Sequence, residues 1–329
     1  MSDPARRTRE GIMEELKRAK QQGELNMNDK YIEKLLQLQG FDIVIIVDDS
    51  GSMQLPSDYQ PDPAVQQTRF QELYNCITKI SKIANVMDDD GIDLIFLNSG
   101  IWKNVRTDAA VQGIFNGTSH RDLPSPGSPG TPLCETYRQF IKMYYPSTYD
   151  YARNHQLIPT RNGTKACGIR SQTVHTGGDN EKPILLILAT DGEPTDGRPE
   201  DLKHIMEVLN PRKLYKSIVA CTGQANVLRF LKSLDTMERT DVTDDFTSEK
   251  RVIDEIQRRW DPSYNFSYDD YLAKILLGSI DPDIDQLNDV ESSVKRGLHL
   301  ATPAAAGGGG SSRKRRKRKL RKNRKTRKQ

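Results

Sequence analysis

The sequence is poor in the features of exported, membrane-spanning and ATP-hydrolysing proteins. Its four cysteines are spread over 329 residues without a Cys-x-x-Cys or Cys/His metal pattern, so we expect unpaired core thiols in a reducing compartment. No apolar run approaches the ~20 residues that span a bilayer, and the first residues hold no apolar core of a signal peptide. A Gly-x-x-x-x-Gly-Lys-Ser/Thr loop for nucleotide phosphates is absent. We therefore expect a cytoplasmic or nuclear protein.

Positive charge is concentrated at the end of the chain. Residues 313–329 hold 13 of the 49 basic residues and no acidic one, which leaves 36 basic against 45 acidic residues elsewhere. Like charges repel, and Leu320 is the only apolar residue of this tail, so we expect the tail to be disordered. It could bind nucleic acid, act as a nuclear import signal, contact an acidic protein or membrane surface, or fold back on the acidic body. Base readout is not expected, because the tail has no aromatic residue for stacking.

Apolar strands alternate with amphipathic helices through the middle of the chain. Phe41–Val47, Ile92–Leu97 and Ile184–Ala189 are apolar runs of strand length, and apolar residues recur at three- and four-residue spacing from Phe70 to Met87. This alternation predicts an α/β fold, a doubly wound and mostly parallel sheet with helices on both faces. In such sheets ligands bind at the carboxyl ends of the strands.

Four segments accompany this α/β domain, which we assign to residues 40–260. Residues 1–39 predict two helices, either packed on the flank of the domain or detachable for binding a partner. Residues 146–181 are polar, lack a clear period and are interpreted as an insertion, either functional or a plain surface loop. Residues 261–300 predict one more helix and an acidic stretch, and residues 301–329 a flexible linker followed by the basic tail.

Oxygen-bearing side chains follow two of the predicted strands. Asp48, Ser50 and Ser52 come directly after the first strand, Asp191 ends a later one, and Thr131 opens a helix. Carboxylate and hydroxyl oxygens are the hard ligands that Mg²⁺ prefers. Asp, Ser and Gly also populate ordinary turns, so the first motif alone would not identify a metal site. Because the carboxyl ends of parallel strands meet at one edge of a sheet, we expect Asp48 and Asp191 to share a site.

In these three segments the chain resembles the von Willebrand factor type A (vWA) domain with its metal-ion-dependent adhesion site (MIDAS). The resemblance implies that Asp48, Ser50, Ser52, Thr131 and Asp191 hold Mg²⁺, with Mn²⁺ or Ca²⁺ as alternatives. In the family the hydroxyls tend to bind directly and one or both carboxylates through water. With so few protein anions, the cation stays electrophilic and can accept a carboxylate from a protein partner. The polar insertion is the main departure from the family pattern.

We therefore predict a binding protein rather than an enzyme. Hydrolysis would need a general base or nucleophile beside the metal, and the five histidines are scattered, with His120 and His175 in loops that flank the site region. The alternatives are a metal-dependent phosphoester hydrolase and a scaffold whose metal is structural. Near the motifs, we expect Asp49 to be solvated or to support the ligands, and Glu193 and Asp196 are candidates for the rim.

Overall fold

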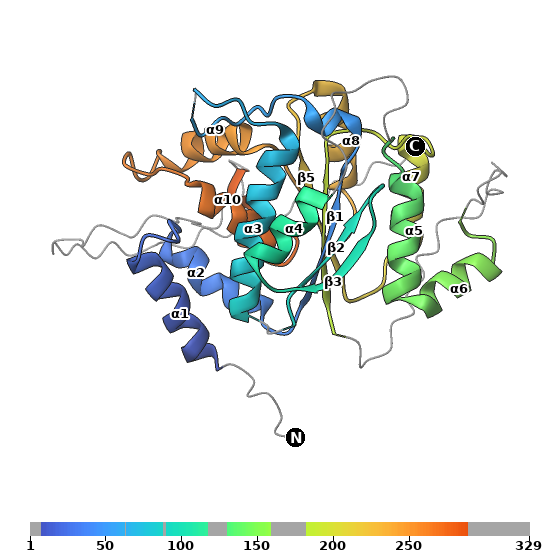
Figure 1. Cartoon of the computed structure of the whole chain (residues 1–329), viewed down its shortest axis with the longest axis horizontal. Helices are drawn as coiled ribbons and strands as arrows, with labels where there is room; N and C mark the ends of the chain where they lie inside the picture. Colours follow the sequence, from blue (N-terminus) through green and yellow to red (C-terminus); the bar gives the residue numbers. More distant parts are fainter. Residues whose placement is uncertain (1–7, 63, 88–89, 118–129, 159–181, 289–329) are drawn as a thin grey trace, which may run out of the picture.

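The computed structural model shows a central sheet covered by helices (Figure 1). The residues it describes are 8–62, 64–87, 90–117, 130–158 and 182–288. The basic tail, the linker before it and most of the polar insertion lie outside the described residues. Within the described ranges, none of the helices combines the length and the apolar character that a membrane span needs.

The sheet has six strands in the order β3-β2-β1-β4-β5-β6. Strand β3 runs antiparallel to β2, and every other neighbouring pair is parallel. The strands are β1 (Asp42–Val47), β2 (Ile92–Phe96), β3 (Ile101–Val105), β4 (Ile184–Thr190), β5 (Leu214–Ala220) and β6 (Thr240–Thr243). Strands β1 and β4 are apolar almost throughout because both of their faces are buried. The predicted α/β class with a mostly parallel sheet is confirmed.

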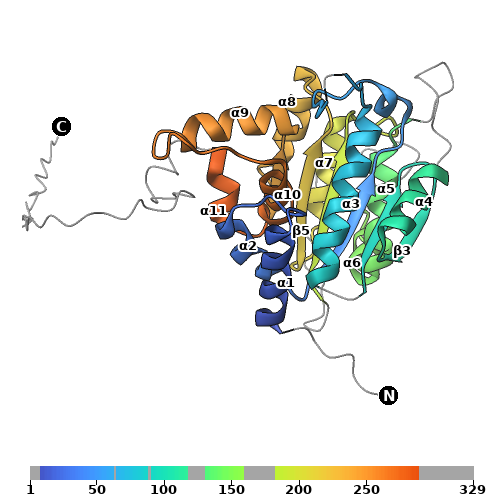
Figure 2. The same ribbon diagram turned by 60° about the vertical axis from the view of Figure 1, so that its left-hand side comes forward.

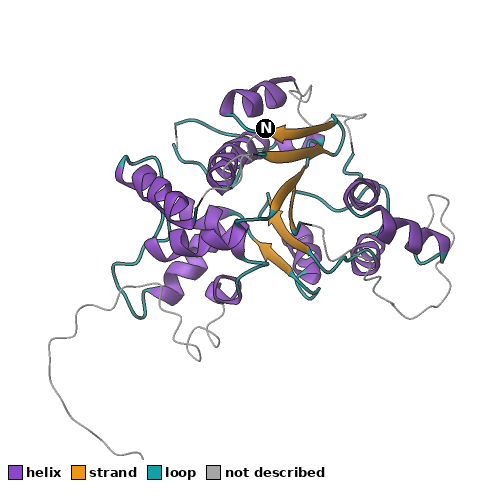
Figure 3. Ribbon diagram, turned by 90° about the horizontal axis from the view of Figure 1, so that it is seen from below, coloured by secondary structure: helices purple, strands orange, loops and turns teal. Residues whose placement is uncertain are grey.

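Helices cover both faces of the sheet, and each face has its own apolar core (Figure 3). In β1 the residues Ile43, Ile45 and Val47 join one core, while Val44 and Ile46 join the other, as the alternation of side chains along a strand requires. The first core includes α3 (Arg69–Met87), α4 (Asp108–Gly117), α9 (Phe246–Gln257) and α10 (Tyr268–Leu277). The second includes α5 (Leu133–Tyr144), α6 (Pro146–Asn154), α7 (Pro199–Val208) and α8 (Ala225–Leu234).

The two ends of the described chain lie together on the first face. Helices α1 (Arg9–Gln21) and α2 (Asp29–Leu35) lie beside α10 and α11 (Pro282–Asp285) in Figure 2. The backbone N–H groups of Asn26 and Asn28 donate to Asp269 at 2.5 Å and to Asp270 at 2.7 Å. Lys34 forms an ion pair with Asp281 at 2.6 Å. The N-terminal helices are therefore packed on the flank of the sheet by polar contacts as well as by apolar ones.

Helix α6 corrects the interpretation of residues 146–181 as a stretch without regular structure. The helix begins at Pro146, which is favoured in a first helical turn because its missing N–H has no partner there in any case. Only Thr148 and Ala152 of this helix are buried, so the sequence shows no apolar period. The rest of the insertion, residues 159–181, is not among the described residues.

Candidate metal centre

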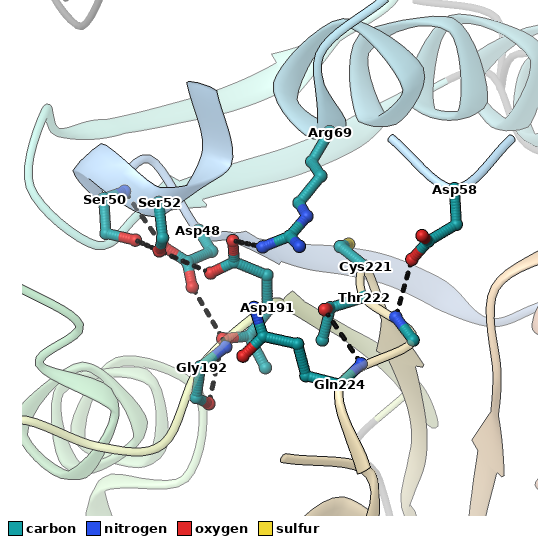
Figure 4. Close-up of polar contacts among 12 residues, drawn as sticks. Asp48, Ser50, Ser52, Asp58, Arg69, Asp191, Gly192, Cys221, Thr222 and Gln224 are labelled. Carbon is teal, nitrogen blue, oxygen red and sulfur yellow. Dashed lines mark hydrogen bonds and ion pairs between the residues drawn. The ribbon is translucent and has the colours of Figure 1, made fainter. Parts of the chain in front are cut away.

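The centre of the site is the junction between β1 and β4. These strands are parallel neighbours with Val47 opposite Ala189, and the N–H of Asp48 donates to the Ala189 carbonyl at 3.0 Å. Strand β2 lies on the other side of β1, so the chain leaves β1 toward one side of the sheet and later returns on the other. Such a switch point at the carboxyl ends of parallel strands is where open α/β sheets bind ligands. The side chains of Asp48 and Asp191 both lie there (Figure 4).

A continuous set of hydrogen bonds connects four of the five predicted ligand residues. The Ser52 hydroxyl donates to Asp191 Oδ1 at 2.7 Å and lies 3.1 Å from the Ser50 hydroxyl. Asp48 Oδ1 accepts from the Ser50 N–H at 2.9 Å, and its Oδ2 accepts from the Thr190 hydroxyl at 2.6 Å. Both residues are buried, Asp48 with no exposed surface and Asp191 with 3% of its residue surface exposed. Segments far apart in the sequence thus bring their oxygen atoms to one place.

Thr131, the fifth predicted ligand, lies beside the end of β4. A Cβ atom added to Gly192 would stand 3.5 Å from Thr131 Oγ1, which places the hydroxyl next to the residue that follows Asp191. Two reciprocal bonds with Thr195 hold the threonine: its N–H donates to Thr195 Oγ1 at 2.9 Å, and its carbonyl accepts from the Thr195 N–H at 2.9 Å. The five residues offer only carboxylate and hydroxyl oxygens, a donor set that fits Mg²⁺.

Burial and like charge together destabilise the ionised form of Asp48. The pKa of Asp48 is raised to about 6 by burial and by the negative charge of Asp191, while hydrogen bonds from Ser50 and Thr190 act in the opposite direction. Two carboxylates held near each other away from water favour a cation between them, because it removes their repulsion. The electrostatics of the site therefore agree with its donor set.

Arg69 is the site residue that the sequence analysis missed. Its Nη1 atom donates to Asp191 Oδ2 at 2.6 Å, and only 7% of the arginine side chain is exposed. Arg69 is the first residue of α3, one helical turn before the buried Leu73 and two before Ile77. Residues four apart share a helix face, so the position of an arginine in the apolar stripe of α3 was the signal that could have identified it.

The remaining acidic residues near the motifs have other roles. Asp49 is fully buried rather than solvated: its Oδ1 accepts from the Asn98 N–H at 2.9 Å, and its Oδ2 accepts from the Ser99 hydroxyl. It therefore fixes the end of β1 to the turn after β2, while a role in supporting the metal ligands stays a prediction. Asp196 accepts from two backbone N–H groups in the first turn of α5, at 2.7 and 3.1 Å, and so caps that helix. Glu193 is exposed. His120 and His175 lie outside the described residues.

Comparison with known proteins gives a limited result. No family model matches the chain, and no curated protein matches it. Among solved structures, the chain is similar to proximal thread matrix protein 1 from the mussel byssus in its second crystal form, at 16% identity and a TM-score of 0.38 over 64% of this chain and 46% of that one. A structure of the same mussel protein with a zinc-occupied MIDAS motif is matched at 17% identity and a TM-score of 0.36, again over 64% and 46%. This chain thus spans less than half of the mussel chain, and similarity at this level assigns neither family nor function.

Proposed function

We propose that the chain is a vWA-type binding protein that holds Mg²⁺ at Asp48, Ser50, Ser52, Thr131 and Asp191. The observation that carries the proposal is the hydrogen-bonded set of two buried carboxylates and two serine hydroxyls at the switch point between β1 and β4. A bound Mg²⁺ would supply an electrophilic coordination position for an outside oxygen. The protein's part is to hold the donors in place and to limit their negative charge.

The partner in this proposal is a protein that presents an Asp or Glu side chain. Three of the five donors are neutral hydroxyls, so the two carboxylates at most balance the charge of a divalent cation. A carboxylate from outside would complete the coordination and add charge neutralisation, while the loss of hydration opposes the gain. We therefore expect a moderate affinity that depends on the metal.

We further propose that the site binds and does not catalyse. In the described part of the chain, the two histidines contact backbone carbonyls away from the predicted ligands. His155 Nδ1 lies 2.8 Å from the Tyr151 carbonyl, and His204 Nε2 lies 3.2 Å from the Leu157 carbonyl. A phosphoester hydrolase would show turnover of generic phosphoesters that depends on Asp48, and we expect none with Mg²⁺ or Mn²⁺.

Metal titration of the purified chain tests the proposal directly. Calorimetry with Mg²⁺ should show one site in the unmodified protein and none after Asp191→Asn. Asp58→Asn is a matched control, because Asp58 accepts from the Gly223 N–H at 2.7 Å near the site and belongs to no predicted ligand set. Unchanged Mg²⁺ binding in the Asp191 variant would refute the assignment. A protein partner should be captured in the presence of Mg²⁺. Loss of this capture with a chelator and in Asp48→Ala would extend the result from metal binding to partner binding.

A further inference from the structure

Both oxygens of the Asp191 carboxylate are already engaged by the protein. Oδ1 accepts from the Ser52 hydroxyl at 2.7 Å, and Oδ2 accepts from Arg69 Nη1 at 2.6 Å. Figure 4 shows the arginine reaching from α3 toward Asp191. The side chain of Asp191 has no exposed surface and that of Arg69 has 7%, so little water screens this ion pair.

The backbone holds Arg69 at this position. The chain that leaves the Ser52 turn folds back, with Pro56 and Thr68 forming an isolated antiparallel bridge. The N–H of Arg69 then donates to the Leu55 carbonyl at 3.0 Å, and α3 begins at the arginine itself. The backbone of Arg69 is thus tied to the segment that follows the predicted ligands Ser50 and Ser52.

Arg69 places a positive charge directly beside the predicted ligand Asp191. A guanidinium stays protonated in proteins, and Arg69 also borders a cavity of about 20 Å³ whose lining includes the acidic residues Glu72 and Asp245. Of the two carboxylates in the predicted ligand set, Asp191 thus forms an ion pair with Arg69, whereas Asp48 accepts from the neutral groups of Ser50 and Thr190. A divalent cation at these ligands would have surplus positive charge.

From this arrangement we propose that Arg69 is a positioning residue that makes tight metal binding depend on an external carboxylate. The inference rests on the proposed function and deepens it: Arg69 touches neither metal nor partner but sets the charge between them. It orients Asp191 through Oδ2 and repels the cation, and a carboxylate from the partner compensates for that repulsion. If Arg69 were purely structural, its loss would have the opposite effect on metal affinity. Asp191 would become disordered, and the metal would bind more weakly.

Mn²⁺ binding followed by electron paramagnetic resonance, with and without acetate as the simplest carboxylate, separates these cases. In the full chain, Arg69→Met should bind Mn²⁺ on the order of tenfold more tightly without acetate, because the like charge near the cation is removed. Acetate should then strengthen Mn²⁺ binding less in this variant than in the unmodified chain. Arg69→Lys, which keeps the charge, should stay within about threefold of the unmodified chain. Lys34→Met is the control, since it removes an ion pair with Asp281 on the flank formed by α2.

The possible outcomes distinguish this inference from the proposed function. If the unmodified chain binds no Mn²⁺, the metal site itself is refuted and the role of Arg69 with it. If the unmodified chain binds Mn²⁺ but Arg69→Met binds it equally or more weakly, the inference on Arg69 is overturned and the metal site stands. Should Arg69→Met lose its circular dichroism signal for folding, Arg69→Gln, whose amide can still donate to Asp191, decides by the same comparison.

Discussion

Ser52 and Asp191, 139 residues apart in the sequence, are joined by a hydrogen bond of 2.7 Å from the hydroxyl to Oδ1. The bond connects the loop after β1 to the end of β4, so the two strand ends act as one unit. Ser52→Ala removes both this bond and one predicted metal ligand. We expect Mg²⁺ affinity to fall by about tenfold or more, while the free energy of unfolding without metal falls by only about 1 kcal/mol.

Calorimetry and chemical denaturation of the Ser52 variant check these two numbers. Ser57→Ala is the matched control, because Ser57 lies on the same segment and bonds to Glu72 and the Tyr59 carbonyl instead of to Asp191. Equal losses of Mg²⁺ affinity in both variants would mean that Ser52 acts through the loop and not as a ligand.

The neighbouring positions of Asp48 and Asp191 were predictable from the sequence because they follow from strand geometry. Two buried strands in an alternating α/β pattern are parallel, and the residues that follow them lie at one edge of the sheet. The ion pair between Arg69 and Asp191 was not predictable in this way. It depends on the chain folding back between Pro56 and Thr68, a turn that no local periodicity encodes.

Some helix boundaries could not be predicted from the apolar pattern, because caps rather than buried residues set them. Helix α9 begins at Phe246 because Asp245 accepts from the Ser248 N–H at 3.1 Å and caps it, a start that the spacing of apolar residues does not show. Helix α6 was missed because it buries too few side chains to produce a period. The metal and the partner remain predictions, since sequence pattern and side-chain geometry supply donors but not a bound ion.

Lys216 should give the protein a measurable dependence of stability on pH. Its pKa is lowered to about 7 by burial and by the charge of Arg239, and its Nζ donates to Asn210 at 2.7 Å. Between pH 7 and the ordinary lysine value the unfolded chain binds a proton that the folded chain does not, so this group makes stability rise with pH across that window. Below pH 7 the folded state holds a buried charge, and its destabilising effect is present in full.

Lys216→Met removes this effect, which equilibrium denaturation at several pH values can measure. Relative to the unmodified chain, the variant should gain roughly 3 kcal/mol of stability at pH 6 and lose that advantage by pH 10. Lys232→Met, at a side chain that is 55% exposed, should differ in stability from the unmodified chain by the same amount at every pH. If the stability difference between Lys216→Met and the unmodified chain also stays constant with pH, the Lys216 amine is solvated in solution.

Asp269 should anchor the N-terminal helices to α10 and α3. The buried carboxylate accepts from the Asn26 N–H at 2.5 Å and forms an ion pair with Lys79 at 2.6 Å. Asp269→Ala leaves both donors without this partner, so we expect a loss of about 2 to 3 kcal/mol. Hydrogen exchange should become faster in α1 and α2 before it does in the strands. The control is Asp283→Ala, where the carboxylate is 45% exposed and a loss within about 0.5 kcal/mol is expected. Equal effects of the two variants would argue against an anchoring role.

The basic tail should bind nucleic acid without regard to sequence. Residues 313–329 concentrate 13 positive charges in 17 residues, and binding to phosphates releases counterions. The full chain should therefore bind unrelated duplexes with similar affinity, and the logarithm of its binding constant should fall linearly with the logarithm of salt concentration. A chain ending at residue 312 should lose this binding while keeping its Mg²⁺ site, because no predicted ligand lies in the tail. Fluorescence anisotropy over a salt series measures both proteins. Full binding by the shortened chain, or a constant that does not change with salt, would exclude the tail as the contact. Nuclear import, an acidic protein or membrane surface, and folding back on the acidic body would then remain as its roles.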